Sequence, residues 1–271
     1  ALTVRSMLYF YLIRTFKEIP LKLKGSYKDT DVVTIGQTPA ATVLAQIEAD
    51  LLKAQALLPE NHAEVSALFT NVNASNTGRI TKAAATTLLA EVYLWNEDYD
   101  KAGVELDKVL NMSRFRLLGR SNASIFDGTT AETIFEISHK DSRANPMYSL
   151  VVDARKPYVA ATDIINADIF PANMEIDVDL VDSRGEGYMY SSGGTIWKYG
   201  AENPSYYNFQ IYRISDVMLM KAEVLAEQGK GAEALSILHT LRDARGAIQA
   251  SDPEVGPNDT EDIIRFVFNE R

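Results

Sequence analysis

The chain has 271 residues, 46% of them hydrophobic and 24% charged, so it can bury a substantial core as one large domain or two small ones. Its formal net charge of −10 at pH 7 disfavours sequence-independent binding to nucleic-acid phosphates. The chain contains no cysteine, which excludes disulfides, thiolate catalysis and Cys-ligated zinc. No apolar run approaches the roughly twenty residues that a membrane-spanning helix needs.

Apolar residues recur at spacings of three and four over long windows, which predicts a mainly α-helical protein. A first helix is expected over residues 1–16, and a loop without periodicity follows over residues 22–38. A second helix is expected after Pro39, which suits the first turn of a helix. The apolar positions define one stripe on each helix: Val4, Leu8, Tyr11 and Leu12 on the first, and Leu44, Ile47, Leu51, Leu52 and Leu58 on the second.

Both ends of the chain read as helix without the residues that normally begin or end one. No capping residue precedes the first helix, and the amphipathic pattern from Asp262 to Arg271 has no terminator. We therefore expect a single domain that is cut at both ends.

The clearest local pattern is a helical hairpin, with one helix over residues 82–95, a turn over 96–99 and a second helix that carries Ala102 and Leu106. A second copy occurs later in the chain. The tripeptide Ala-Glu-Val at 90–92 precedes Ala102 by twelve residues, and the same tripeptide at 222–224 precedes Ala234 by twelve. Such small residues in a helix pair are typical of tetratricopeptide-like hairpins, although the two copies are not in tandem.

The chain divides into a helical scaffold over residues 1–112, a loop-rich region over 113–208, and a second hairpin with the start of a further helix over 209–271. In the middle region Gly, Asn, Ser, Asp and Pro accumulate. Residues 133–137 there alternate weakly, which predicts a short strand, and residues 164–170 predict a short helix. Long connections of this kind often carry binding surfaces.

Short motifs follow one another along nearly the whole chain in an order that is distinctive as a set, although none is specific alone. They are residues 2–16 with 19–21, 47–51 with 58–59, 78–85 with 89–94, 132–137, 182–184, 198–199, 212–223, 241–246 and the closing pair 270–271. In these residues and this order, the chain resembles the SusD/RagB family of glycan-binding lipoproteins. It departs from the family in lacking a signal peptide and lipid-bearing cysteine, and it stops where the family usually continues.

The resemblance implies an all-α scaffold of tetratricopeptide-like hairpins with a long loop-rich insertion. It also implies a lipid-anchored protein on the outward face of the outer membrane, joined to the membrane only through an anchor that this sequence does not contain. Such a protein captures an oligosaccharide and passes it to a SusC-like TonB-dependent transporter for import. In that arrangement the helical hairpins contact the transporter, the loop residues of the other face hold the sugar, and no bond is broken.

A pyranose ring has an apolar C–H face and a rim of hydroxyls, so it favours an aromatic platform beside planar polar groups. The loop-rich region supplies both, among several glycines. The candidate glycan-binding residues are Tyr148, Tyr158, Tyr188, Tyr190, Trp197, Asn203 and Tyr206. For each aromatic residue the alternative is a buried plug or a loop anchor, which is the commoner role.

Three motif arginines, Arg79, Arg184 and Arg213, are read as structural because guanidinium groups commonly hold loops through carbonyls or carboxylates. Glu91 and Glu223 stand at matched helix positions and are expected to pair with neighbouring helices.

No metal or cofactor is expected. The acidic stretch Glu175, Asp177, Asp179, Asp182 and Glu186 suggests calcium, but it lacks the ligand and glycine positions of an EF-hand, so a solvated run is favoured. The three histidines are isolated in sequence and show no zinc-site spacing.

Two other classes of function remain as alternatives to sugar capture. A helical glycoside hydrolase would need two carboxylates, for which Glu132 and Glu136 are the first suspects, but only their spacing supports it. A tetratricopeptide-like adaptor would bind a protein on a concave helical surface. The favoured prediction is a non-enzymatic binding protein without catalytic residues.

Overall fold

The structure, a computed structural model, describes residues 1–66, 76–119, 130–139, 145–151, 158–164, 182–197, 207–247 and 254–271. It is mainly helical with one small sheet, which confirms the predicted fold class. The helices are α1 (Leu2–Phe16), α2 (Ala40–Leu57), α4 (Lys82–Trp95), α5 (Tyr99–Leu110), α6 (Pro146–Val151), α7 (Thr162–Ile164), α8 (Ile214–Glu227), α9 (Gly231–Arg245) and α10 (Thr260–Glu270). The strands are β1 (Thr133–Ile137) and β2 (Phe209–Arg213), and short 3-10 helices cover Asp29–Asp31 and His62–Glu64.

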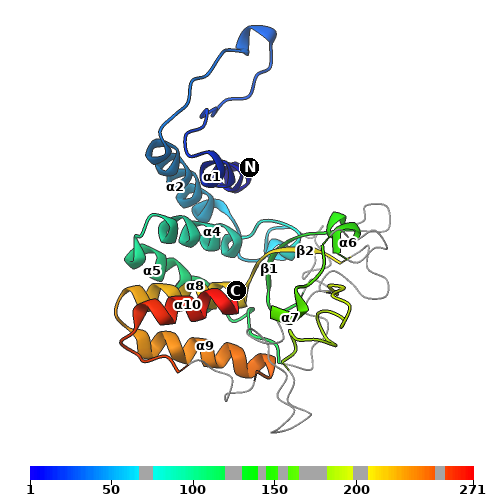
Figure 1. Cartoon of the computed structure of the whole chain (residues 1–271). Coiled ribbons are helices and arrows are strands. Elements are labelled where there is room, and N and C mark those ends of the chain that lie inside the picture. Colours follow the sequence, from blue (N-terminus) through cyan, green and yellow to red (C-terminus); the bar gives the residue numbers. More distant parts are fainter. Residues whose placement is uncertain are drawn as a thin grey trace.

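The long helices stack in one continuous series, in which α1 packs on α2, α2 on α4, α4 on α5, α5 on α8, and α8 on both α9 and α10. Figure 1 shows this stack as one body, with the sheet, α6 and α7 beside it. None of the helices in the described ranges is long and apolar enough to cross a membrane. The helical stack therefore provides the scaffold, and the described elements between α5 and α8 lie beside it.

The two predicted hairpins form as expected, from α4 with α5 and from α8 with α9. The matched small and apolar residues are completely buried in both copies: Ala90, Ala102 and Leu106 in the first, and Ala222, Ala234 and Leu238 in the second. Between the hairpins, a Cβ built on Gly103 of α5 would lie 3.4 Å from Val224 of α8, so these helices approach closely. The repeat in the sequence thus reflects a repeat in the packing.

Strand β1 occupies the five residues that the alternating pattern predicts, and it pairs antiparallel with β2. The sequence did not predict β2, which runs directly into α8. The pairing joins Thr133 to Arg213 and Ile137 to Phe209, with irregular register between them. The pairing brings together two segments that lie far apart in the sequence, since β1 lies within the loop-rich region and β2 directly follows it.

The apolar stripe of α1 faces solvent, although such a stripe usually marks the packed side of a helix. The buried residues of this helix are Thr3, Ser6, Phe10 and Ile13. Helix α1 packs on α2, and Arg5 of α1 forms an ion pair with Asp50 of α2 at 2.7 Å. The stripe residues Val4, Leu8, Tyr11 and Leu12 are 40–58% exposed, and Leu52 on α2 is 46% exposed as well.

Candidate functional site

The loop of residues 182–197 folds back on itself without forming a regular strand. Isolated β-bridges join Tyr190 to Glu186 and to Ile196, and the Trp197 amide donates to the Met189 carbonyl at 2.7 Å. Gly187 and Gly194 have φ values of 86° and 77°, which L-residues with side chains rarely adopt. These glycines permit the tight turns that bring the two halves of the loop together.

Backbone hydrogen bonds connect this loop to the other segments that carry predicted site residues. The Ala160 amide donates to the Gly194 carbonyl at 2.8 Å, and the Tyr158 amide donates to the Leu150 carbonyl of α6 at 3.2 Å. A Cβ built on Gly194 would lie 2.9 Å from the Ala160 carbonyl oxygen, so only glycine fits this contact. We call α6, residues 158–164 and residues 182–197 together the loop cluster.

The predicted aromatic residues of the loop cluster differ in exposure. Tyr158 is 62% exposed and Tyr188 is 50% exposed, whereas Tyr148 and Trp197 are partly buried. Tyr190 is only 3% exposed, so its ring has no free face in this structure and serves as a plug of the loop. The prediction that Tyr190 provides a platform for a sugar ring is therefore wrong for this structure. Asn203 and Tyr206 lie outside the described residues.

A buried ionic network fixes the base of the loop cluster to the C-terminal helices. Arg184 bonds to Asp182 at 2.7 Å and to Glu270 of α10 at 2.5 Å, and Glu270 also accepts from Arg242 of α9 at 2.5 Å. Burial acts to lower the pKa of Arg184, but the two carboxylates outweigh it and raise that pKa above its ordinary value. The structural role predicted for Arg184 is confirmed.

A second buried pair connects α9 to the start of β1. Glu132 is fully buried, receives two hydrogen bonds from Arg245 at 2.8 and 2.9 Å, and accepts from the Leu118 amide at 2.7 Å. Arg245 also donates to the Leu118 carbonyl at 2.9 Å. Burial lowers the pKa of nearby Arg213, while the charge of Glu132 acts to raise it. Glu132 therefore holds Arg245 of α9 and the backbone at Leu118 in place, which is a structural role.

Glu136, the second carboxylate that suggested a hydrolase, is also buried, with 1% exposure, and accepts from the Thr77 hydroxyl at 2.8 Å. Two fully enclosed carboxylates offer no open space between them for a glycosidic bond. Within the described residues, no group of three or more His, Asp or Glu side chains could hold a metal ion. Asp182 is engaged by Arg184, while Glu175, Asp177 and Asp179 lie outside the described residues.

The matched helix carboxylates pair with neighbouring elements, as predicted. Glu91 accepts from Arg14 of α1 at 2.8 Å and from the Tyr212 hydroxyl of β2 at 2.5 Å. Burial is the main cause that raises the pKa of Tyr212 well above its ordinary value, and Glu91 adds to it. Glu223 pairs with Arg271 after α10 at 3.1 Å.

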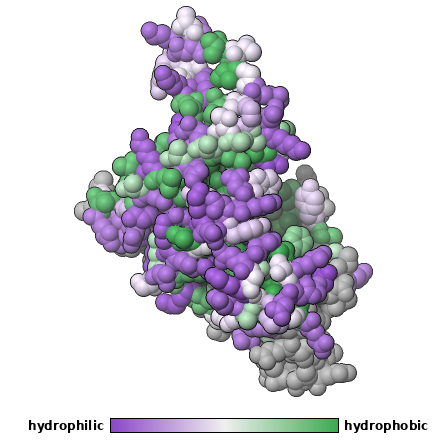
Figure 2. All heavy atoms as spheres, turned by 90° about the vertical axis from the view of Figure 1, so that its left-hand side faces the viewer, coloured by the Kyte–Doolittle hydropathy of each residue, from purple (hydrophilic) through white to green (hydrophobic). Residues whose placement is uncertain are grey.

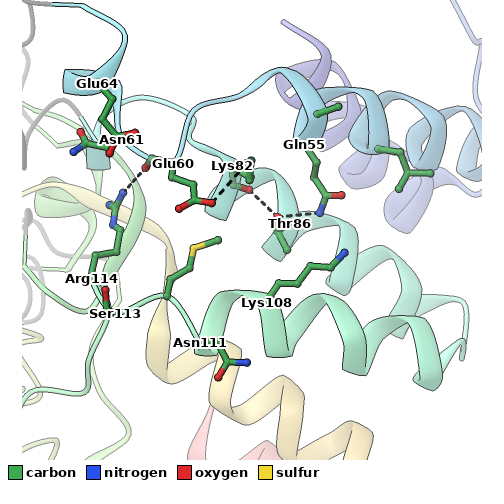
Figure 3. Close-up of a pocket in the computed structure, with 13 residues that line it drawn as sticks. Gln55, Glu60, Asn61, Glu64, Lys82, Thr86, Lys108, Asn111, Ser113 and Arg114 are labelled. Atoms are coloured by element: carbon green, nitrogen blue, oxygen red, sulfur yellow. Dashed lines mark hydrogen bonds and ion pairs between the residues drawn. The ribbon is translucent and has the colours of Figure 1, made fainter.

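The scaffold also contains a cavity of about 870 Å³ that no sequence motif predicts. It lies between the C-terminal part of α2, the start of α4 and the end of α5, and Figure 3 shows its polar side chains converging from these elements. The lining residues are Leu52, Gln55, Ala56, Glu60, Asn61, Glu64, Lys82, Thr86, Lys108, Asn111, Met112, Ser113 and Arg114. They come from separate stretches of the chain that only packing brings together.

Comparison with protein families gives two matches, one at each end of the chain. Residues 1–94 match a family described as "Starch-binding associating with outer membrane", and residues 184–271 match one described as "SusD family". The chain belongs to the SusD/RagB family. The predicted resemblance is thereby confirmed, since both matches are to SusD-like family models.

Among curated proteins, the chain is 25% identical over 291 aligned positions to the SusD-like protein P2 of Formosa agariphila, covering 88% of this chain and 54% of that protein. Among solved structures, SusD superfamily proteins share the fold. One from Bacteroides fragilis has a TM-score of 0.73 at 19% identity, covering 99% of this chain and 62% of the other. One from Bacteroides vulgatus has a TM-score of 0.72 at 22% identity, covering 100% and 62%. This SusD/RagB chain thus spans less than two thirds of the length of each of these relatives.

Proposed function

We propose that this protein captures an oligosaccharide at the loop cluster and does not cleave it. The observation that carries the proposal is the exposure of Tyr158 and Tyr188 on segments held together by backbone hydrogen bonds. Exposed aromatic rings on a fixed frame suit the apolar face of a sugar, because little side-chain freedom is lost on binding. The enclosed ion pair of Glu132 and the burial of Glu136 weigh against hydrolysis at those carboxylates.

The family supports this class of ligand, since a related structure from Bacteroides vulgatus is described as a SusD-like carbohydrate binding protein. That structure has a TM-score of 0.67 at 18% identity and is covered over 58% of its length. We propose further that the protein acts on the outward face of the outer membrane, where a lipid anchor holds it beside a SusC-like TonB-dependent transporter. One family match is described in terms of outer-membrane association, which supports that location.

The surface is compatible with a partner that associates reversibly. Figure 2 shows the face that lies at the left of Figure 1, where hydrophilic side chains predominate and hydrophobic ones form small separate groups. Permanent interfaces are generally more apolar than this face. A contact with the transporter through such a face would therefore open and close, as delivery of a captured sugar requires.

A glycan-panel titration by calorimetry tests the proposal, using the chain and its variants Tyr188→Ala, Tyr158→Ala and Trp197→Ala. Loss of a stacking ring is expected to weaken binding by roughly 2- to 12-fold, from about 0.5–1.5 kcal/mol per aromatic contact. Tyr27→Ala is the matched control, because Tyr27 is 90% exposed but lies in the segment between α1 and α2. Equal losses in the control, release of shortened glycans, or no binding across the panel would each overturn the proposal.

A further inference from the structure

The cavity between α2, α4 and α5 combines cations with unengaged polar groups, away from the loop cluster. Its lining includes three cations, Lys82, Lys108 and Arg114, together with the carboxylates Glu60 and Glu64, in a chain whose net charge is −10. Several lining residues, including Glu60, Glu64 and Asn111, are exposed, which leaves the cavity open to solvent. Its volume lies within the range of about 300–1,000 Å³ that is usual for small-molecule sites.

Two of the three cations already have carboxylate partners. The Lys108 ammonium lies 2.6 Å from Glu105, a buried carboxylate behind the cavity wall that also accepts from Gln55 at 2.7 Å. The Lys82 ammonium lies 3.6 Å from the Glu60 carboxylate, and Figure 3 marks this ion pair with a dashed line. Among the three lining cations, Arg114 is therefore the one whose described contacts include no carboxylate.

Arg114 has contacts with a carbonyl and a ring, and neither carries a negative charge. Its guanidinium donates to the Glu60 carbonyl at 3.0 Å and lies 4.5 Å from the centre of the Phe115 ring. Burial lowers the pKa of Arg114 from its ordinary value, which marks its charge as partly desolvated. A carboxylate placed in the cavity would accept the remaining guanidinium N–H groups in a charge-assisted, bidentate contact.

The other free groups in the cavity suit hydroxyls. The Asn111 amide and the Ser113 hydroxyl can both donate and accept, and Glu64 can accept; within the described residues none of these side chains has a hydrogen-bond partner. Leu52 and Met112 add apolar surface beside them. Such a rim complements a hydroxyl-rich ring, and Arg114 complements an acid on that ring.

We propose that this cavity is a second binding site, which takes a short saccharide bearing a carboxylate, such as a uronic acid disaccharide, with the carboxylate on Arg114. The choice of a saccharide rests on the proposed function, whereas the choice of an acid rests on the cavity. The lining includes no aromatic side chain, so hydrogen bonds and charge provide the binding and stacking does not. Affinity at this site should therefore fall as salt increases.

Calorimetric titration with digalacturonate and with a neutral disaccharide of matched linkage tests the site. Arg114→Gln is expected to weaken digalacturonate binding by about tenfold or more, since a hydrogen bond to a charged group is lost. Asn111→Ala, which alters an exposed side chain, should weaken it by a few-fold and guards against a folding defect in the first variant. Arg116→Gln is the matched control, because Arg116 is exposed two residues further on and does not line the cavity.

The outcomes separate this inference from the function proposed for the loop cluster. Digalacturonate binding that survives Tyr188→Ala but not Arg114→Gln supports the second site. Loss in Tyr188→Ala with no change in Arg114→Gln overturns it and leaves the loop cluster as the glycan site. Equal affinity for the neutral disaccharide, or for a short peptide with a free carboxylate, overturns the assignment of an acidic saccharide. An absence of binding by every glycan in the panel overturns both proposals.

Discussion

Replacement of Glu132 by Gln should lower the free energy of unfolding more than any surface substitution does, because it leaves the buried charge of Arg245 without its partner. Arg245 is 3% exposed, and Glu132 supplies the carboxylate that receives two of its hydrogen bonds. Breaking a buried ion pair by removing one partner costs about 3–5 kcal/mol. The true cost is expected near the upper end, since Glu132 also counteracts the desolvation of Arg213.

Urea denaturation followed by circular dichroism measures this cost through the midpoint and slope of the transition. The double variant Glu132→Leu with Arg245→Met removes both charges, and it should recover part of the loss because no unpaired ion is left buried. The surface pair of Arg265 with Asp262 is the control, since Arg265 is 69% exposed and Arg265→Gln should cost no more than about 1 kcal/mol.

The reasoning would be refuted if Glu132→Gln and Arg265→Gln destabilised the protein equally. A double variant less stable than Glu132→Gln alone would likewise contradict it. An unchanged free energy of unfolding in Glu132→Gln would mean that water reaches the pair, and Glu132 would then regain its standing as a candidate acid or base. The experiment thus tests the anchoring role and the non-enzymatic reading together.

Two smaller predictions concern helix ends. Asp98→Ala should cost about 1 kcal/mol at pH 7, because the Asp98 side chain accepts from the Lys101 amide at the start of α5. Lys101 lowers the pKa of Asp98, so this contribution is present above the unfolded-state pKa of about 3.9, and the variant's deficit in urea midpoint should shrink below it. Gly231→Ala should lower the thermal midpoint more than Gly229→Ala, since its Cβ would lie 2.0 Å from the Pro257 carbonyl oxygen, whereas Gly229 has open space and an added Cβ meets only the backbone strain of its φ of 72°. The reverse order would contradict the packing of α9.

Local signals in the sequence were sufficient for the first hairpin. Helix α4 has the predicted limits, and α5 begins at Tyr99, the last residue of the predicted turn, because Asn96 and Glu97 end one helix and Asp98 caps the next. Strand β2 was not predicted because no turn residue separates it from α8, and because its partner β1 lies far away in the sequence. A strand is stabilised by the strand that pairs with it, and the local sequence pattern does not identify that partner.

The aromatic loop was found from composition, but composition does not assign each ring. Tyr188 and Tyr190 are two residues apart, so in a strand they would share one face. The turn around Gly187 breaks that alternation, leaving Tyr188 half exposed and Tyr190 buried. The cavity near Arg114 was missed for a related reason, because its walls come from segments that have no shared pattern in the sequence.

Helix α1 shows why an apolar stripe does not by itself identify the packed side. The side against α2 carries Thr3 and Ser6, whose small side chains let the helices approach, and Phe10, which fills the core with 2% exposure. Phe10→Ala should therefore cost about 3–5 kcal/mol, whereas Leu8→Ser, at a residue 58% exposed, should stay within about 0.5 kcal/mol of the parent in the same urea titration. A loss above about 2 kcal/mol for Leu8→Ser would mean that the stripe is covered in solution. Gel filtration of both variants would then separate self-association from an error in the packing of α1.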